Sequence, residues 1–265
     1  MTKLQVNDIQ IAYDDVGLGP PVVLLHGYPF NRSLWTDQVD SLSNRYRFVT
    51  PDLRGHGESD VGEGVASMEA MAAEVAALMD ALGISRAFIG GLSMGGYVAL
   101  AFYRNFPSRV KALILADTRP QADTEEGKRT RAQQVEQVLA NGMSPIVDAM
   151  LPKLLSPETV SKRPEVVKRI RDMMFQTKPA GAAAALQGMA SRANQTELLG
   201  RIRVPTLILV GREDAITPVQ DSETMQALIG GSRLVIIENA GHVSNVERPA
   251  EFNSALAAFL TGISE

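Results

Sequence analysis

Hydrophobic positions along this chain follow two patterns that alternate. Largely apolar runs of strand length cover residues 22–25, 112–116 and 205–210, whereas residues 68–82 repeat their apolar side chains at helical spacing. Continuous apolar runs are typical of strands that are buried on both faces, as in a parallel sheet. Strands that alternate with helices predict parallel βαβ units, so we expect an α/β fold with a doubly wound, mostly parallel sheet.

The remaining predicted elements continue this alternation. Further strands are expected at residues 4–6, 10–15, 48–49, 87–89 and 234–237, the first two forming a hairpin. Further helices are expected at residues 34–42, 97–106, 219–229 and 249–260. The last of these has proline near its first turn, a position that tolerates the missing N–H group.

The stretch after the sixth predicted strand interrupts the alternation. It contains no convincing strand, and its helical segments, separated by Pro or Gly, cover residues 124–141, 145–155, 164–175 and 179–193. We therefore predict an all-helical lid at residues 119–199, inserted into a core formed by residues 1–118 and 200–265. A chain of 265 residues that is 45% hydrophobic suits one such domain.

Composition excludes several classes of protein. The formal net charge is -4 with both signs mixed along the chain, so we expect no nucleic-acid partner. The chain has no cysteine, which removes disulfides, thiolate metal sites and a cysteine nucleophile. Its three histidines lie far apart in sequence, so no metal site is expected. The first residues lack the apolar core of a signal peptide, and no run reaches membrane-spanning length, which predicts a cytoplasmic protein without membrane contact.

Ser93 is the candidate nucleophile. It sits in Gly91-Leu-Ser-Met-Gly95, between the predicted strand 87–89 and the helix-like run that begins at Gly96. This is the strand–turn–helix context of a nucleophile elbow, in which glycines two residues on either side avoid collisions in a sharp turn. The helix that follows directs its N-terminal N–H groups at a developing oxyanion.

A serine hydroxyl needs a base, and His242 is the best placed candidate. It follows the last predicted strand in Asn239-Ala-Gly-His242, on a loop at the carboxyl edge of the sheet. His26 and His56 compete for the role, but both lie in Gly-rich loops, where histidine is more often structural. A histidine near its ordinary pKa can take the serine proton at neutral pH.

The acid that orients this base is predicted to be Asp214, which follows the penultimate strand. Glu213 is adjacent but is expected to point outward. Asp117, at the end of strand 112–116, is a rival on the same sheet edge. The order Ser93, Asp214, His242 is the hydrolase order of nucleophile, acid and base.

Two backbone N–H groups are needed to stabilise the oxyanion. Met94 directly follows the nucleophile, and the loop after strand 22–25 supplies the second donor, for which we expect Tyr28 rather than Gly27. The predicted substrate contacts are Gly27, Phe30, Trp35 and Val243.

Taken together, these motifs resemble lid-bearing α/β-hydrolases of the serine esterase, enol-lactonase and cofactor-free haloperoxidase group. The resemblance rests on His26-Gly-Tyr-Pro29, Gly211-Arg-Glu-Asp214 and the segments 52–59, 91–96 and 241–242. It implies the triad Ser93, Asp214 and His242, the oxyanion donors Tyr28 and Met94, a structural turn at 52–59, and no cofactor. Haloalkane dehalogenases and most epoxide hydrolases of this fold have aspartate at the position of Ser93, which argues against both activities.

The expected function is hydrolysis of a small carboxylic ester through an acyl-enzyme intermediate, by a monomer or homodimer. Lactone, enol-lactone, carbon–carbon bond and peroxide-dependent reactions use the same triad and remain alternatives. An enol-lactone substrate with a free carboxylate would need a cation, for which Arg32, Arg119 and Arg192 are candidates. A ligand sensor with an intact triad and slow turnover is the non-enzymatic alternative.

Overall fold

The computed structural model describes residues 2–264, and within this range it contains an eight-stranded sheet of order β1-β2-β4-β3-β5-β6-β7-β8. The strands are β1 (Thr2–Val6), β2 (Ile9–Val16), β3 (Pro21–Leu25), β4 (Arg47–Pro51), β5 (Ala87–Leu92), β6 (Val110–Ala116), β7 (Thr206–Gly211) and β8 (Arg233–Ile237). β1 pairs antiparallel with β2 and β2 with β4, and all other pairs are parallel. The predicted mostly parallel sheet, including its opening hairpin, is confirmed.

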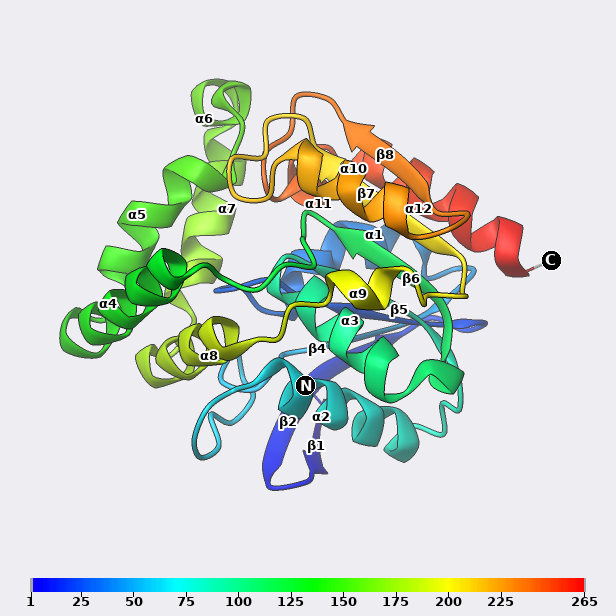
Figure 1. Ribbon diagram of the computed structural model, residues 1–265, viewed down its shortest axis with the longest axis horizontal. Helices are drawn as coiled ribbons and strands as arrows, with labels where there is room; N and C mark the ends of the chain where they lie inside the picture. Colours follow the sequence, from blue (N-terminus) through cyan, green and yellow to red (C-terminus); the bar gives the residue numbers. More distant parts are fainter. Residues whose placement is uncertain (1, 265) are drawn as a thin grey trace.

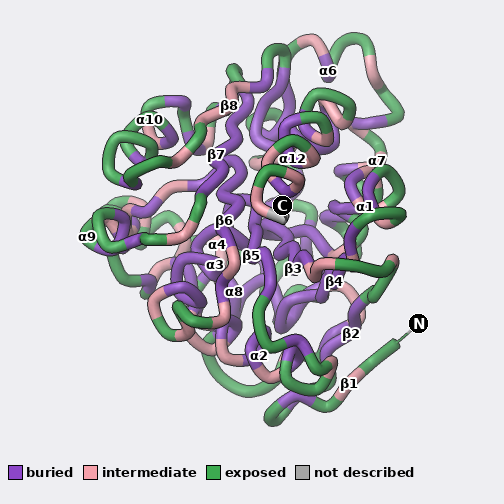
Figure 2. The backbone as a smooth tube through the Cα atoms, turned by 90° about the vertical axis from the view of Figure 1, so that its right-hand side faces the viewer, coloured by how far each residue is buried: buried purple, intermediate pink, exposed green. Residues whose placement is uncertain are grey.

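Burial explains why the central strands are continuously apolar. Every residue of β5 and β7 is buried, and the tube in Figure 2 is buried along the middle of the sheet. The helices on both faces are α1 (Thr36–Leu42), α2 (Met68–Ala81), α3 (Met94–Asn105), α10 (Val219–Leu228) and α12 (Pro249–Ser264). In α2 the predicted stripe faces inward, and the Ser67 side chain caps its first turn by accepting the Ala70 N–H at 3.1 Å.

Short helices fill several connections between these elements. They are the α-helices α9 (Thr196–Leu199) and α11 (Ser244–Glu247) and the 3₁₀-helices η1 (Arg32–Trp35) and η2 (Pro107–Arg109). None spans enough residues to show a helical period of its own, and only the end of η1 falls inside a predicted helix, the one at residues 34–42. Two of them, η1 and α11, lie close to the loops that carry the candidate site.

The segment between β6 and β7 is helical, as expected, and Figure 1 shows its helices gathered at one side of the sheet. It contains α4 (Glu125–Asn141), α5 (Ser144–Leu154), α6 (Pro157–Lys162), α7 (Pro164–Phe175) and α8 (Pro179–Ser191). The prediction missed α6, whose first turn is capped by Ser156. Buried side chains of this segment and of the sheet belong to one continuous hydrophobic cluster. The division into a core and a lid at 119–199 stays a prediction.

Helix α8 packs closely on the rest of the molecule. A Cβ atom built on Gly181 would lie 1.8 Å from the carbonyl oxygen of Gly55, and one on Gly188 would lie 1.8 Å from that of Ala66. Only glycine allows the two backbones to approach so far. The Ala66 N–H also donates to the Ala184 carbonyl at 3.3 Å, which ties this helix to the loop before α2.

Candidate active site

Ser93 occupies a sharp turn between β5 and α3. Its backbone angles are φ 55° and ψ -115°, in the left-handed half of conformational space that non-glycine residues rarely adopt. A Cβ on Gly95 would lie 2.1 Å from the Leu25 carbonyl oxygen, so glycine is required for the turn to fold back over β3. The Thr118 hydroxyl donates to the Ser93 carbonyl at 2.8 Å and fixes the turn to the end of β6. The predicted strand–turn–helix geometry is confirmed.

The parallel register brings the ends of neighbouring strands to one edge. Leu92 pairs with Ala116, and Gly211 pairs with Ile237, so the loops after β5, β6, β7 and β8 leave the sheet together. His242 follows β8 and Asp214 follows β7. His242 Nδ1 lies 2.8 Å from Asp214 Oδ2, and both side chains are buried. The structure therefore joins the predicted base to the predicted acid.

Hydrogen bonds hold the Asp214 carboxylate in place. Oδ1 accepts the N–H groups of Ile216 and Thr217 at 2.8 and 2.9 Å, and Oδ2 accepts the Thr217 hydroxyl at 2.7 Å. Burial alone would raise the pKa of Asp214, but His242 and the hydrogen bonds from Thr217 lower it below its ordinary value. Burial alone would lower the pKa of His242, and the Asp214 carboxylate raises it above its ordinary value. The pair is thus arranged to stabilise an imidazolium.

Asp117, the rival acid, has other partners. Its Oδ1 accepts the Gly211 N–H at 2.8 Å and its Oδ2 accepts the Ser244 hydroxyl at 2.6 Å. Burial raises the pKa of Asp117 well above its usual range, and the nearby Asp214 charge adds to the shift. A carboxyl group that resists ionisation is poorly suited to stabilise an imidazolium. Glu213 is exposed.

The other two histidines are buried within the loops after β3 and β4. His26 Nδ1 donates to the Gly27 carbonyl and its Nε2 accepts the Leu53 N–H, both at 2.9 Å, and the His26 and His56 rings are 5.0 Å apart. Burial lowers the pKa of His26 to about 4 and that of His56 to about 3. Both are therefore neutral at neutral pH, and their contacts give them a structural role.

The segment 52–59 is held as a turn by its own polar groups. Asp52 Oδ1 accepts the Arg32 N–H at 2.7 Å, and its Oδ2 accepts the Glu58 N–H at 2.9 Å. The Ser59 hydroxyl donates to the Asp52 carbonyl at 2.7 Å. The Arg32 side chain forms ion pairs with Asp52, Glu58 and Asp14. These three acids satisfy Arg32, which argues against it as a carboxylate clamp.

The loop after β3 lies directly against the elbow. A Cβ on Gly27 would be 3.2 Å from Ser93 Cβ, and the Phe30 N–H closes a turn by donating to the Gly27 carbonyl at 2.9 Å. This turn contains Tyr28, whose ring meets that of His56 edge to face at a centroid distance of 6.1 Å. Burial raises the pKa of the Tyr28 phenol above its ordinary value. Met94 is the first residue of α3.

The remaining predicted contacts, Phe30, Trp35 and Val243, are all fully buried. Val243 directly follows the candidate base. The Trp35 ring packs against Phe252 of α12 at a centroid distance of 6.2 Å, which is a core contact. A substrate contact by Phe30, Trp35 or Val243 stays a prediction.

A cluster of arginines, which we call the Asp123 cluster, lies where the helical segment meets the end of β6. Arg192 Nη1 lies 2.8 Å and Arg119 Nη2 3.4 Å from Asp123 Oδ1, and Arg131 Nε binds the other oxygen. The Arg192 guanidinium also stacks on the Tyr97 ring, 4.3 Å from its centroid. Arg119 Nε is buried and has no hydrogen-bond partner among residues 2–264. Sequence analysis missed Arg131, because nothing in the spacing relates it to Asp123.

The field of this cluster reaches the candidate site. The Arg119 charge opposes protonation of His242, although burial and Asp214 have larger effects on that pKa. The Arg131 charge partly offsets the effect of burial on the pKa of the Tyr28 phenol.

Within the described residues no group of acidic or histidine side chains could hold a metal ion, and no helix is long and apolar enough to cross a membrane.

Comparison with known proteins agrees with this geometry. The model of the alpha/beta hydrolase fold family matches residues 20–249. The chain belongs to the α/β-hydrolase fold family. This α/β-hydrolase is 30% identical to 3-oxoadipate enol-lactonase 1 of Acinetobacter baylyi over 99% of its own length and 97% of that protein.

Solved structures of the family are similar over their whole length. A thermophilic esterase from Thermogutta terrifontis, solved with malate bound, is 40% identical with a TM-score of 0.98, covering 100% of both chains. The enol-lactonase from Burkholderia xenovorans is 29% identical with a TM-score of 0.92, covering 98% of this chain and 100% of the other. The α/β-hydrolase described here thus lies in the esterase and enol-lactonase group of the family.

Proposed function

We propose that this α/β-hydrolase cleaves small carboxylic esters through an acyl-enzyme, with Ser93 as nucleophile, His242 as base and Asp214 as the acid that orients it. The observation that carries the proposal is the Asp214–His242 pair at the same sheet edge as the strained Ser93 turn. The Nδ1 proton shared with Asp214 leaves Nε2 of the imidazole available to the serine proton. Similarity to esterases and enol-lactonases supports the same reaction class.

In the proposed reaction the Ser93 oxygen attacks the ester carbonyl while His242 takes its proton. The tetrahedral oxyanion is stabilised by the backbone N–H groups of Met94, at the start of α3, and Tyr28, in the turn against the elbow. His242 then gives the proton to the departing alcohol. Water, activated by His242 in the same way, attacks the acyl-enzyme and releases the acid.

Initial rates on p-nitrophenyl esters from acetate to dodecanoate test this proposal, with Ser93→Ala as control. We expect ordinary enzymatic rates, roughly 1–10³ per second on the best substrate, that vanish in the Ser93 variant. A folded wild-type protein without Ser93-dependent turnover on esters or lactones would overturn the proposal. Such a result would favour the ligand sensor, which a binding experiment could then examine.

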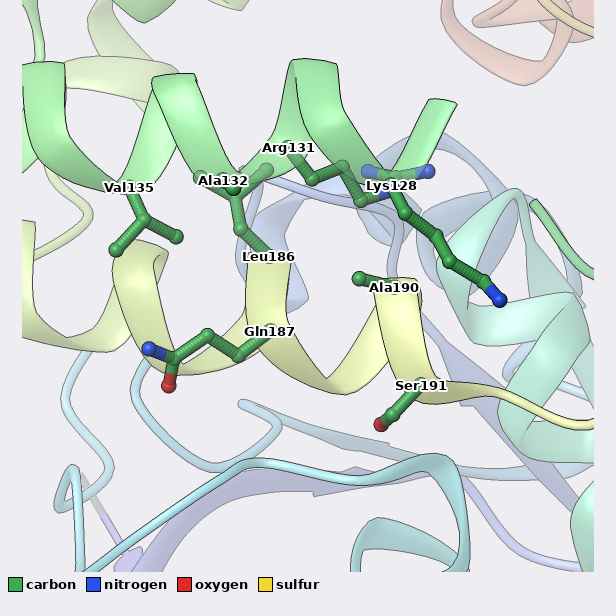
Figure 3. Close-up of a pocket in the computed structure, with 8 residues that line it drawn as sticks. All are labelled: Lys128, Arg131, Ala132, Val135, Leu186, Gln187, Ala190 and Ser191. Atoms are coloured by element: carbon green, nitrogen blue, oxygen red, sulfur yellow. The ribbon is translucent and has the colours of Figure 1, made fainter. Parts of the chain in front are cut away.

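A second candidate, hydrolysis of a lactone or ester that bears a free carboxylate, is favoured by the Asp123 cluster. Three guanidinium groups surround one carboxylate there, so the cluster carries excess positive charge, and the Arg119 charge acts on His242. Arg192 is largely occupied, because it also donates to the carbonyls of Met189 and Gln121. Arg131 also lines a groove of about 360 Å³ between α4 and α8 (Figure 3), which includes none of the proposed triad residues; what favours Arg131 is its charge, which acts on Tyr28. We therefore propose Arg119 and Arg131 as the cations that receive a substrate carboxylate.

Two matched substrates distinguish the candidates: a neutral diester and the monoester of the same dicarboxylic acid. If Arg131 receives a carboxylate, Arg131→Gln raises KM for the monoester by roughly tenfold or more and leaves the diester nearly unchanged. Arg129→Gln is the control, since this exposed arginine lies on the same helix. Equal effects of Arg131→Gln on both substrates would overturn the carboxylate subsite and leave ester hydrolysis intact.

A further inference from the structure

The loop that carries His242 rests on the C-terminal end of α5. The His242 N–H donates to the Leu154 carbonyl at 2.9 Å. A Cβ built on Gly241 would lie 2.9 Å from both that carbonyl oxygen and the Ser156 nitrogen, so the two backbones are in direct contact. The backbone of the candidate base therefore contacts the helical segment, while its side chain contacts Asp214.

Glu247, at the end of α11, links these two backbones. Its Oε1 accepts the Gly241 N–H at 2.6 Å, and its Oε2 accepts the Ser156 N–H at 2.8 Å. The side chain is fully buried, and no cation among residues 2–264 forms an ion pair with it. A buried carboxylate is costly unless its oxygens are hydrogen-bonded, so both N–H groups are held firmly. One carboxylate oxygen thus binds the loop that carries His242, and the other binds the helical segment.

We propose that Glu247 is a positioning residue that couples the helical segment to the catalytic base. This inference rests on the proposed function, in which His242 takes the serine proton. Because one carboxylate binds both Gly241 and Ser156, a shift of residues 154–156 is transmitted to Gly241 and to the adjacent imidazole. The arrangement of the helical segment thereby sets how well His242 aligns with Asp214 and Ser93, and displacement by about 1 Å is enough to slow a reaction 10²-fold.

The first test replaces the carboxylate while keeping its shape. Glu247→Gln must turn an NH₂ group toward one of the two N–H donors, which breaks one arm of the link. We expect kcat to fall roughly 10- to 100-fold with little change in KM, as for residues that orient an active-site ligand. Glu158→Gln is the matched control. This half-exposed glutamate lies two residues after Ser156, in α6, but binds Arg248 and Lys162 instead. Equal kcat values for wild type and Glu247→Gln would overturn the proposal.

A purely structural role would lower the amount of folded enzyme without changing the base. Two measurements separate the roles. If His242 leaves its contact with Asp214, its pKa falls, so the acidic limb of the rate profile moves to lower pH in Glu247→Gln. The downfield proton NMR signal of the His242 Nδ1 proton, identified by its loss in His242→Ala, should weaken or shift. A lower rate with an unmoved pH limb and an unchanged signal would reject positioning.

A second pair of variants tests the arm to the helical segment and does not depend on Glu247→Gln folding. Ser156 has φ -64°, and the preceding Leu155 is extended at φ -118° and ψ 147°, so proline fits the backbone at 156. Ser156→Pro removes the N–H group, whereas Ser156→Ala removes only the hydroxyl that caps α6. We expect Ser156→Pro to lower kcat at least tenfold relative to Ser156→Ala. Equal kcat values would show that the helical segment is not coupled to the base.

Failure of this inference can be told from failure of the proposed function. Wild-type turnover that requires Ser93 and His242 establishes the function independently of Glu247. In a double-mutant cycle, Glu247→Gln should cost little further activity in a His242→Ala background, because its effect passes through the imidazole. Additive losses would mean that Glu247 acts elsewhere, and would overturn the coupling while leaving the hydrolase intact.

Discussion

His242 Nδ1 lies 2.8 Å from Asp214 Oδ2, and the carboxylate is held by three further hydrogen bonds from Ile216 and Thr217. Asp117 is buried nearby but bonds Gly211 and Ser244. Two carboxyl groups near one imidazole thus have different environments, one favouring the charged form and one the neutral form. Such a separation of pKa values indicates which of them stabilises the imidazolium.

The first prediction compares these two acids. Asp214→Asn removes the charge that stabilises the imidazolium and the acceptor that fixes its tautomer, so kcat should fall about 10³- to 10⁴-fold, the size seen in a serine protease triad. Asp117→Asn keeps an acceptor for Gly211 and places an amide against the Ser244 hydroxyl, which can accept it. We expect a change of only a few fold in steady-state rates on an activated ester. A larger loss for Asp117→Asn would transfer the role of the acid to Asp117.

The second prediction concerns backbone strain at Ser93, the proposed nucleophile. Ser93→Ala should abolish turnover and keep φ near 55°, where a Cβ atom is unfavourable. Ser93→Gly should also be inactive, but glycine tolerates this conformation. Its free energy of unfolding should therefore exceed that of Ser93→Ala by about 1 kcal/mol, which gives a higher urea midpoint. Equilibrium unfolding of both variants checks the order. If alanine proves the more stable, the elbow is not strained at Ser93.

The third prediction is the pH dependence of the rate. In the proposed mechanism turnover requires neutral His242, and the Asp214 carboxylate raises the pKa of this imidazole above its ordinary value of 6.5. The rate should therefore fall as pH decreases through a midpoint above 6.5, and reach a plateau at higher pH. His26 and His56, with pKa values of about 4 and about 3, do not titrate in that range. A profile of kcat/KM from pH 5 to 9 tests this, and a rate that is flat across that range would contradict it.

Local pattern predicted the parts of the site that follow strands. Ser93, Asp214 and His242 each come within five residues of the end of a predicted strand, and a parallel sheet brings such positions to one edge. The glycines on either side of Ser93 predicted the sharp turn, because two backbones can approach so closely only where no Cβ atom intervenes. Periodicity likewise found the long helices, because a stripe of several turns leaves a clear signal.

Contacts between distant segments left no such signal. Glu247 binds Ser156 across 91 positions, and His242 binds Leu154 from the loop after β8. In sequence, nothing distinguishes Glu247 from other acidic residues, and α6, α9 and α11 are each too short to show a period. The contacts behind the proposed coupling between the helical segment and His242 are therefore visible only in the three-dimensional structure.

The last prediction tests how tightly α8 packs against the 52–59 turn. In an isolated helix, Gly181→Ala would be favourable by about 1 kcal/mol, because alanine is the better helix former. In this structure the new Cβ would lie 1.8 Å from the Gly55 carbonyl oxygen and 2.8 Å from Gly55 Cα. Backbone atoms cannot turn aside as a flexible side chain does, so α8 and the 52–59 turn must separate.

We therefore expect Gly181→Ala to lower the free energy of unfolding by about 1–3 kcal/mol, the usual cost of overpacking. Gly200→Ala is the control: its φ of -66° suits alanine, and a Cβ there meets nothing within 4 Å. Urea unfolding of the two variants and the wild type gives the comparison. If Gly181→Ala unfolds at the same or a higher urea concentration than the wild type, α8 can move away from the turn at little cost, and the close glycine contact does not fix its position.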